Sequence, residues 1–292
     1  MIVSRISWGI WALVPVAAVT YHFGPGQTAY VVDRAARQQN QANETQTEAQ
    51  LDQDVAYSKH LAAIDARRQA FLDPTTANQQ AALDATKSEE SAYTKAAFTW
   101  KATSDRFQDV LTTLGDASPK EARDIRWAKA RADVRAGEIW TGIDELESLV
   151  TELDGSPKLD DALARAAREE LATAYYYGAR LLRLSGMPVQ EWRIESGKAR
   201  QHFRYLAERE LAKSADNDDA TASAKNYQRN LELVLNLEQS SLAELQGKPL
   251  PKDSPHAGKP GNRPGKRPGK GKGPPAQDGR GAGGPQEIRD GW

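Results

Sequence analysis

Three consecutive tyrosines have the type and spacing that could bind a partner. Tyr175, Tyr176 and Tyr177 follow one another in a predicted helix, where successive side chains differ in direction by about 100°. The three rings cannot all face one core, so we expect one or more of them to be exposed to a protein partner. The alternative is that two rings pack and the third fills the gap toward the next helix.

Two pairs of arginines lie nearby at the spacing of neighbours on a helix. Each pair could clamp a carboxylate of an acidic peptide. The alternative is a solvated face on which the arginines pair with the nearby acids Glu169, Glu170, Glu195 and Glu208. The pairs are Arg180 with Arg183, and Arg200 with Arg204.

No arrangement of residues in the chain predicts catalysis. Cysteine is absent, and so are a Gly-rich phosphate loop after a strand, a His-Glu-x-x-His pair and a Gly-x-Ser-x-Gly elbow. The four histidines are scattered, at His22, His60, His202 and His256, so we expect no shared metal site. We therefore predict a protein that is not an enzyme and that uses neither a cofactor nor a metal.

A basic tail follows the predicted helices, at residues 248–292. It holds 11 of the 22 glycines and 9 of the 15 prolines, with ten Lys or Arg against four acids, a net charge of +6. The rest of the chain carries 29 basic and 36 acidic residues, a net charge of -7. The composition predicts disorder. Its charge predicts weak binding of an anionic polymer or lipid, although a solubilising spacer fits equally well. The residues expected to bind are Lys259, Arg263, Lys266, Arg267, Lys270 and Lys272.

The N-terminal sequence predicts that the body of the protein is located outside the cytoplasm. Ile6–Phe23 is an 18-residue apolar stretch, near the lower limit for crossing a membrane, and Arg5 precedes it. The positive-inside rule places the body across the membrane from Arg5. The alternative is a signal peptide cleaved after Ala18, which exports the body as well.

Helices are predicted for the body, and no strand. A helical hairpin is expected to turn at Asp73-Pro74-Thr75, with a solvated helical stalk or flexible spacer at Arg37–Asp54 before it. Glycines at 115, 155, 186 and 247 predict left-handed helix ends. The outgoing arm offers Tyr57, Leu61, Ile64, Arg68 and Phe71 as its seam. The returning arm offers Leu83, Thr86, Glu90, Tyr93, Ala97, Trp100, Ser104, Phe107, Leu111 and Leu114.

Residues 119–212 carry spacings of small and large residues that repeat between helix pairs. Gly142-x-x-x-Leu146-x-x-Leu149 is matched by Ala199-x-x-x-Phe203-x-x-Leu206, and Leu171-Ala172-x-x-Tyr175 lies between them. The Ser118-Pro119 and Ser156-Pro157 helix starts are 38 residues apart. This region resembles the tetratricopeptide repeat, whose period is 34 residues. The resemblance implies a docking scaffold with a groove along stacked helices and without catalytic residues.

The predicted fold class is all-α. The predicted function is a non-catalytic, membrane-anchored scaffold or adaptor for protein–protein interaction in the cell envelope. The alternatives are a polyanion-binding protein that acts through its tail, or a structural spacer. The sequence leaves the protein partner and the oligomeric state open. The predicted parts are a signal anchor or signal peptide at 1–24, a stalk and coiled-coil-like hairpin at 28–115, a tetratricopeptide-like domain at 116–247 and the disordered basic tail at 248–292.

Overall fold

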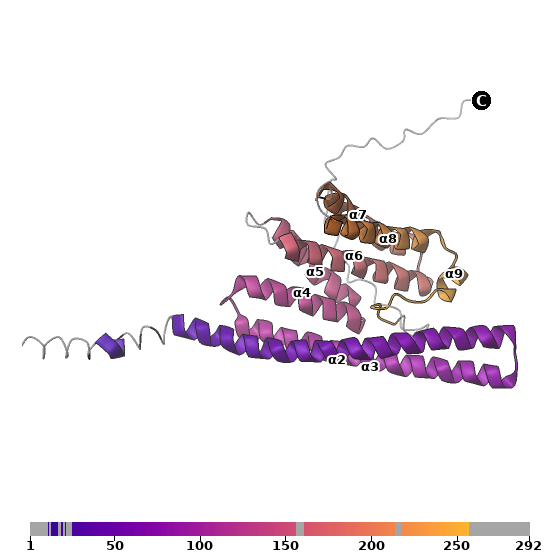
Figure 1. The fold of residues 1–292 in the computed structure, drawn as a ribbon, viewed down its shortest axis with the longest axis horizontal. Helices are drawn as coiled ribbons and strands as arrows, with labels where there is room; N and C mark the ends of the chain where they lie inside the picture. The colour runs from indigo at the N-terminus through magenta and orange to yellow at the C-terminus, as the bar shows by residue number, and fades with distance from the viewer. Residues whose placement is uncertain are drawn as a thin grey trace, which may run out of the picture.

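A computed structural model of the chain describes residues 11, 13–16, 19, 21, 25–155, 161–213 and 218–256. These residues form helices and no strand, so the prediction of an all-α fold is confirmed. The helices, labelled as in Figure 1, are α2 (Pro25–Leu72), α3 (Thr76–Leu114), α4 (Pro119–Ala136), α5 (Ile139–Asp154), α6 (Asp161–Leu184), α7 (Val189–Lys213), α8 (Asp218–Gln239) and α9 (Leu242–Gly247).

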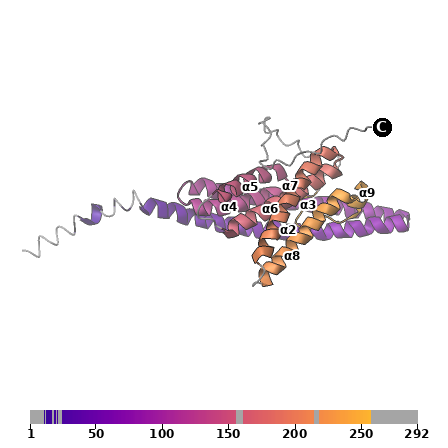
Figure 2. The ribbon, with the colours of Figure 1, turned by 90° about the horizontal axis from the view of Figure 1, so that it is seen from above.

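The helices from α2 to α8 pack in chain order, each against the one before and the one after it. The hairpin α2–α3 lies along one side of the molecule, and α4 to α9 are stacked over part of its length (Figure 1). The same arrangement is visible from above, where α8 runs obliquely across the hairpin (Figure 2). The hairpin and the stack are therefore joined by direct packing of α4 on α3.

The hairpin turns where the sequence predicts, between Leu72 and Thr76. Thr75 caps the start of α3 by accepting a hydrogen bond from the Asn78 N–H at 3.2 Å. On α3 the predicted seam is partly confirmed, since Tyr93, Trp100, Ser104, Phe107 and Leu114 are buried, while Leu83 is exposed.

The predicted seam on α2 is wrong. Phe71 is 85% exposed and Leu61 is 39% exposed. The buried stripe consists instead of alanines at intervals of seven residues, which allows the backbones of α2 and α3 to approach closely. These are Ala35, Ala42, Ala49, Ala56 and Ala63.

The segment Arg37–Asp54 is helical, which agrees with the predicted stalk and not with the flexible spacer, but it is not fully solvated. It is part of the continuous 48-residue helix α2. Ala42 packs with residues of α3 and α4, and Ala49 packs with Trp100 and with α4. The burial could not be predicted from large apolar residues, because the buried apolar residues of the segment are alanines and its other buried residues, Asp52 and Gln53, are polar.

The core of the stack consists of large apolar residues. Ile143, Leu146, Leu149 and Leu171 are buried completely or nearly so in one cluster that extends from α4 to α9. Gly142 allows α5 to lie against α4, because a Cβ at this position would come within 2.5 Å of the Val134 side chain. The small residue of the repeat-like pattern thus has a packing reason.

Helix ends differ from the predictions at several positions. Gly115 and Gly186 have positive φ as expected, whereas Gly155 is right-handed and Gly247 is the last residue of α9. α8 and α9 are separate helices, because Ser241 begins α9 with a complete capping box.

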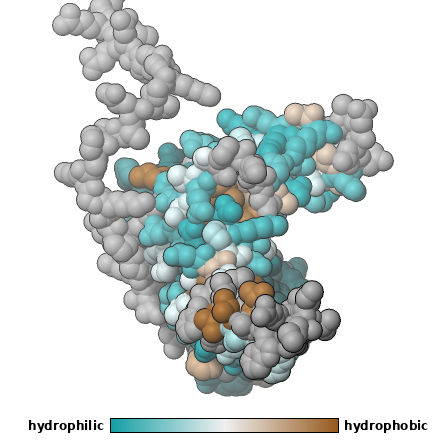
Figure 3. Space-filling view, turned by 90° about the vertical axis from the view of Figure 1, so that its left-hand side faces the viewer, coloured by the Kyte–Doolittle hydropathy of each residue, from teal (hydrophilic) through white to brown (hydrophobic). Residues whose placement is uncertain are grey.

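The N-terminal residues described by the structure are helical and apolar. Trp11, Val16 and Tyr21 are each more than 60% exposed. Figure 3 faces this end, where brown apolar atoms gather beside grey ones at the near end of the hairpin. Within the described residues, no helix combines the length and apolar character needed to cross a membrane. Most of the predicted span Ile6–Phe23 lies outside these residues.

Candidate functional site

The three consecutive tyrosines lie in the middle of α6, between α5 and α7, and all are buried. Tyr175 is 1% exposed, Tyr176 7% and Tyr177 4%, so the prediction that at least one is exposed is wrong. The Tyr175 hydroxyl donates a hydrogen bond to Glu147, and its ring stacks on His202 with centroids 5.9 Å apart. Burial, and then the Arg168 guanidinium, lowers the pKa of His202 to about 4, so this imidazole is neutral near pH 7.

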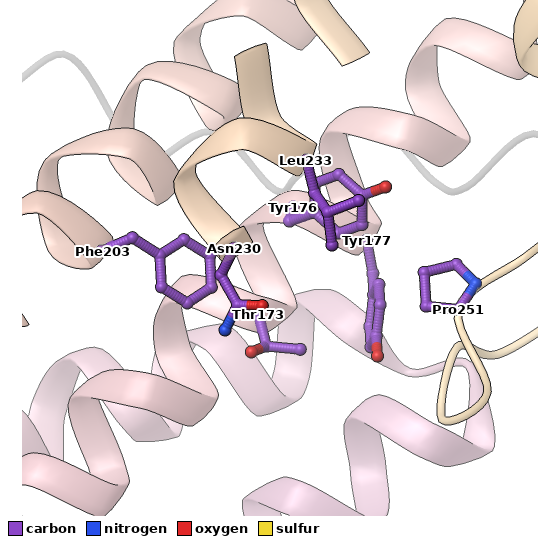
Figure 4. Close-up of a pocket in the computed structure, with 7 residues that line it drawn as sticks. All are labelled: Thr173, Tyr176, Tyr177, Phe203, Asn230, Leu233 and Pro251. Atoms are coloured by element: carbon purple, nitrogen blue, oxygen red, sulfur yellow. The ribbon is translucent and has the colours of Figure 1, made fainter. Parts of the chain in front are cut away.

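Two of the tyrosines line a pocket instead of standing on a surface. Tyr176 and Tyr177 project from α6 toward Leu233 of α8 and toward Pro251, as Figure 4 shows. The cavity has a volume of about 90 Å³. Leu233 is 46% exposed, which places part of the lining at the surface. The other lining residues are Thr173, Phe203 and Asn230.

The first arginine pair binds the main chain at the two ends of α9. Arg180 is 5% exposed and donates to the carbonyl oxygens of Leu245, Lys248 and Pro249, at 3.2 to 3.4 Å. Arg183 donates to the Ser240 carbonyl. Arg180 therefore holds the end of α9, and Arg183 holds the junction between α8 and α9.

The second arginine pair is divided between two environments. Arg200 donates to the Glu238 carboxylate of α8 at 3.0 Å, and Ser196 donates to the same carboxylate at 2.9 Å. Arg204 is exposed on α7. The pair is not arranged as one clamp, and the acid that Arg200 contacts is not one of those expected from the sequence.

Residues 248–256, which we call the strap, leave α9 and return to the hairpin. The Gln53 side-chain amide donates to the Lys252 and Ser254 carbonyl oxygens at 3.0 Å each. Leu250 packs against Ala56 of α2 and against residues of α3. The predicted tail begins at Lys248, but the structure places its first nine residues on the body.

Glu89, Tyr93 and two histidines form a polar cluster between the hairpin and the strap, in which His256 is the last residue of the strap and is partly exposed. His60 Nδ1 lies 2.6 Å from Glu89 Oε1, and His256 Nε2 lies 3.6 Å from the same oxygen. The His256 ring stacks on Tyr93 with centroids 4.6 Å apart. Histidines that are 196 positions apart in the sequence thus share one carboxylate.

Hydrogen bonding determines the protonation of this cluster. The Leu250 N–H donates to His60 Nε2 at 3.0 Å, so the ring proton is on Nδ1 and is donated to Glu89. Burial alone would raise the pKa of Glu89, but the neighbouring His256 imidazole and the hydrogen bond from His60 outweigh it and lower the pKa to about 2. Burial, and then the Glu89 charge, raises the pKa of Tyr93 above its usual range. The described residues include no group of side chains suited to a metal ion.

Arg135 joins the hairpin, the stack and the strap. Its side chain is 4% exposed and donates to Glu170 of α6 at 2.6 Å. Its guanidinium carbon lies 5.7 Å from the ring centroid of Trp100 on α3, and a terminal nitrogen lies 3.7 Å from Asp253 of the strap. A buried charge with this many partners fixes how the three parts fit together.

The basic residues expected to bind a polyanion lie outside the described part of the chain. They are Lys259, Arg263, Lys266, Arg267, Lys270 and Lys272. No protein-family model matches the chain, and comparisons with curated proteins and with solved structures also found no match.

Proposed function

We propose that the chain is a non-catalytic docking scaffold of the cell envelope that binds a protein partner at the pocket between α6, α7, α8 and the strap. The observation that carries this proposal is the pocket itself, which aromatic and aliphatic side chains line and which reaches the surface at Leu233. Concave sites with apolar walls and few polar groups are typical of binding. Asn230 and Thr173 supply polar groups for orientation.

The resemblance to the tetratricopeptide repeat agrees with this proposal. α4 with α5, and α6 with α7, are helix pairs that pack in succession. In that family the groove along such pairs receives a peptide. Here the candidate binding site is the pocket between α6 and α8, and the strap residue Pro251 closes one side of this pocket.

An N-terminal anchor, or an export signal in the same segment, completes the proposal. The exposed apolar side chains of Trp11, Leu13 and Val16 support it, because a helix exposing such residues is costly in water and favourable in lipid. Fractionation of cells followed by N-terminal sequencing of the mature chain tests this part. Recovery of the chain in the cytosol with Met1 intact would contradict both the anchor and the export signal.

Site-specific photocrosslinking tests the docking site. A photoreactive amino acid in place of Leu233 should capture a defined partner in intact cells. The matched control is the same amino acid in place of Ile194, which is 60% exposed on α7 and is not among the pocket residues. Identical adducts from the two positions, or none from Leu233, would contradict docking at the pocket.

A second candidate function is polyanion binding through the basic tail. The strap favours it, since Lys252 pairs with Asp54 at 3.0 Å and residues up to His256 are held on the hairpin. The basic residues after the strap therefore begin at a fixed point of the body. Removal of residues 257–292 should abolish binding to an anionic polymer, and binding by the full chain should weaken steeply with salt. Unchanged binding without these residues would contradict this function.

A further inference from the structure

The groove that receives the strap is built to bind a peptide main chain. Gln53 and His60 are polar residues of the long helix α2, yet with the strap in place they are only 1% and 6% exposed. Burying an amide or an imidazole is costly unless its hydrogen bonds are made. The strap makes them, since its carbonyls accept from Gln53 and its Leu250 N–H donates to His60. Contacts to the main chain bind a peptide without depending on the identity of its side chains.

The strap has a pattern that another peptide can reproduce. One aliphatic residue, Leu250, enters the groove against Ala56, Tyr93 and Ala96. A tight turn follows, in which the Ser254 N–H donates to the Pro251 carbonyl at 3.0 Å.

Two charged contacts also hold the strap in this position on the groove. Lys252 lies against Asp54, and His256 lies against Glu89. The groove therefore fits a peptide with an aliphatic residue, a proline-initiated turn and basic side chains.

We propose that this groove is a peptide-binding site, that the strap occupies it in cis, and that a peptide of the same pattern from a partner protein displaces the strap. Three of the nine strap residues are buried, namely Leu250, Ser254 and Pro255, and none of them belongs to the apolar core of the stack. Pro251 also lines the pocket between α6 and α8, so the groove and the pocket are adjacent and form one surface for a partner.

The strap should compete with any peptide added in trans. An occupant linked to its own site has an effective concentration of about millimolar. The full wild-type chain should therefore bind a free strap peptide weakly. A chain whose own strap cannot dock should bind the same peptide about tenfold or more tightly, because that competitor is gone.

The test uses a fluorescein-labelled peptide of residues 248–256 and three full-length chains: wild type, Leu250→Asp and Leu242→Asp. Leu242 is 42% exposed on α9 and contributes no groove contact, so it is the matched control. Fluorescence anisotropy should show tight binding by the Leu250→Asp chain and weak binding by the other two. Equal affinity for all three chains, with circular dichroism showing that each is folded, would overturn the proposal.

A second measurement remains decisive if Leu250→Asp does not fold. Saturating unlabelled peptide should reduce hydrogen-exchange protection of the Leu250 amide in the wild-type chain, whose N–H is bound to His60. Unchanged protection at saturation would overturn the proposal. The outcome is independent of the pocket test, because neither measurement uses Leu233 or requires a partner at the pocket.

Discussion

In the hairpin, α2 contacts α3 through alanines seven residues apart, whereas in the stack α5 contacts its neighbours through Ile143, Leu146 and Leu149. Alanine seams bring helices close together but bury little apolar area per residue, at about 25 cal/mol for each Å². The hairpin must therefore gain stability from the large residues of α3 and from the elements that cover it. The part of the hairpin between Glu89 and the turn is less well covered, since Leu83 and Phe71 in this part are exposed.

The hairpin and the stack are therefore stabilised in different ways. The stack has an apolar core of its own, while the hairpin depends on contacts with α4 and with the strap. Trp100 is covered by α4, and Tyr93 is covered by Leu250 and His256. Changes at the junction should therefore be more costly than changes within either region.

The largest effect is expected from Arg135→Met at the junction. The substitution leaves the Glu170 carboxylate, which is 11% exposed, without its closest cation, and should reduce the free energy of unfolding by about 3–5 kcal/mol. Urea denaturation of the full chain measures this. Arg123→Met on the same helix is the control, because its pair with Glu152 is 3.7 Å long and partly exposed, and it should cost less than about 1 kcal/mol. Equal losses for the two variants would show that Arg135 does not join the regions.

The next effect is expected from Leu146→Ala in the stack. Leu146 is 0% exposed, and its removal should leave a cavity that costs about 2–5 kcal/mol. Leu83→Ala in the hairpin is the same substitution at a side chain that is 58% exposed, and should cost about 0.5 kcal/mol or less. Chemical denaturation compares the two. Similar losses would remove the contrast between the regions.

Helix boundaries were predictable because glycine and proline mark them chemically. The turn at Asp73-Pro74-Thr75 and the helix end at Gly115 follow directly from the sequence, and the structure has both. The capping box at Ser241 was overlooked, although Ser241 with Glu244 has the spacing of that motif.

The seam of α2 does not follow from the periodicity of its large apolar residues, because the residues that form the seam are alanines. Leu61 and Phe71 share a spacing of three and four with their neighbours, but that stripe is turned away from the seam used by α2. The signal that could have revealed the seam is an alanine at every seventh position from Ala35 to Ala63. Polar residues on the same face, Gln53 and His60, mark where the strap docks.

The predictions of an exposed tyrosine and of disorder from Lys248 onward are wrong for a common reason. In both cases, elements distant in the sequence cover the residues in the folded chain. α6 lies between α5 and α7 and is buried around most of its circumference, so three consecutive rings can all be enclosed. Lys248–His256 has the composition of a disordered segment, yet Leu250 and main-chain hydrogen bonds to Gln53 hold it. Local composition contains no information about partners that arrive from 190 residues away.

A smaller effect is expected from overpacking the alanine seam. Ala49→Leu places extra methyl groups where Ala49 meets Trp100, and should cost about 1–3 kcal/mol. Ala62→Leu on the exposed face of the same helix is the control and should change stability by less than about 0.5 kcal/mol. Thermal unfolding of both variants measures this. A neutral Ala49→Leu would show that the two helices have room to move apart.

The smallest effect concerns pH and the cluster under the strap. The pKa of Glu89 is lowered to about 2, below its ordinary value of 4.5, so its ionised form stabilises the fold above about pH 4.5. The contribution should decrease as pH falls from 4.5 toward 2, where the carboxyl is protonated in the folded chain too. His60 and His256 face this carboxyl, and Arg67 lies 3.4 Å from its other oxygen.

Unfolding free energies of the wild type and of Glu89→Gln, measured between pH 6 and pH 2, test this directly. The advantage of the wild type should be constant down to about pH 5 and should then diminish. Asp105→Asn is the control, because Asp105 is 62% exposed in an i,i+4 pair with Lys101 and belongs to no such cluster. A wild-type advantage over Glu89→Gln that stays constant to pH 2 would show that the carboxyl gains nothing from the two histidines. The strap would then be held by Leu250, by its main-chain hydrogen bonds to Gln53, His60 and Arg180 and by the Lys252–Asp54 pair, without a contribution from the Glu89 charge.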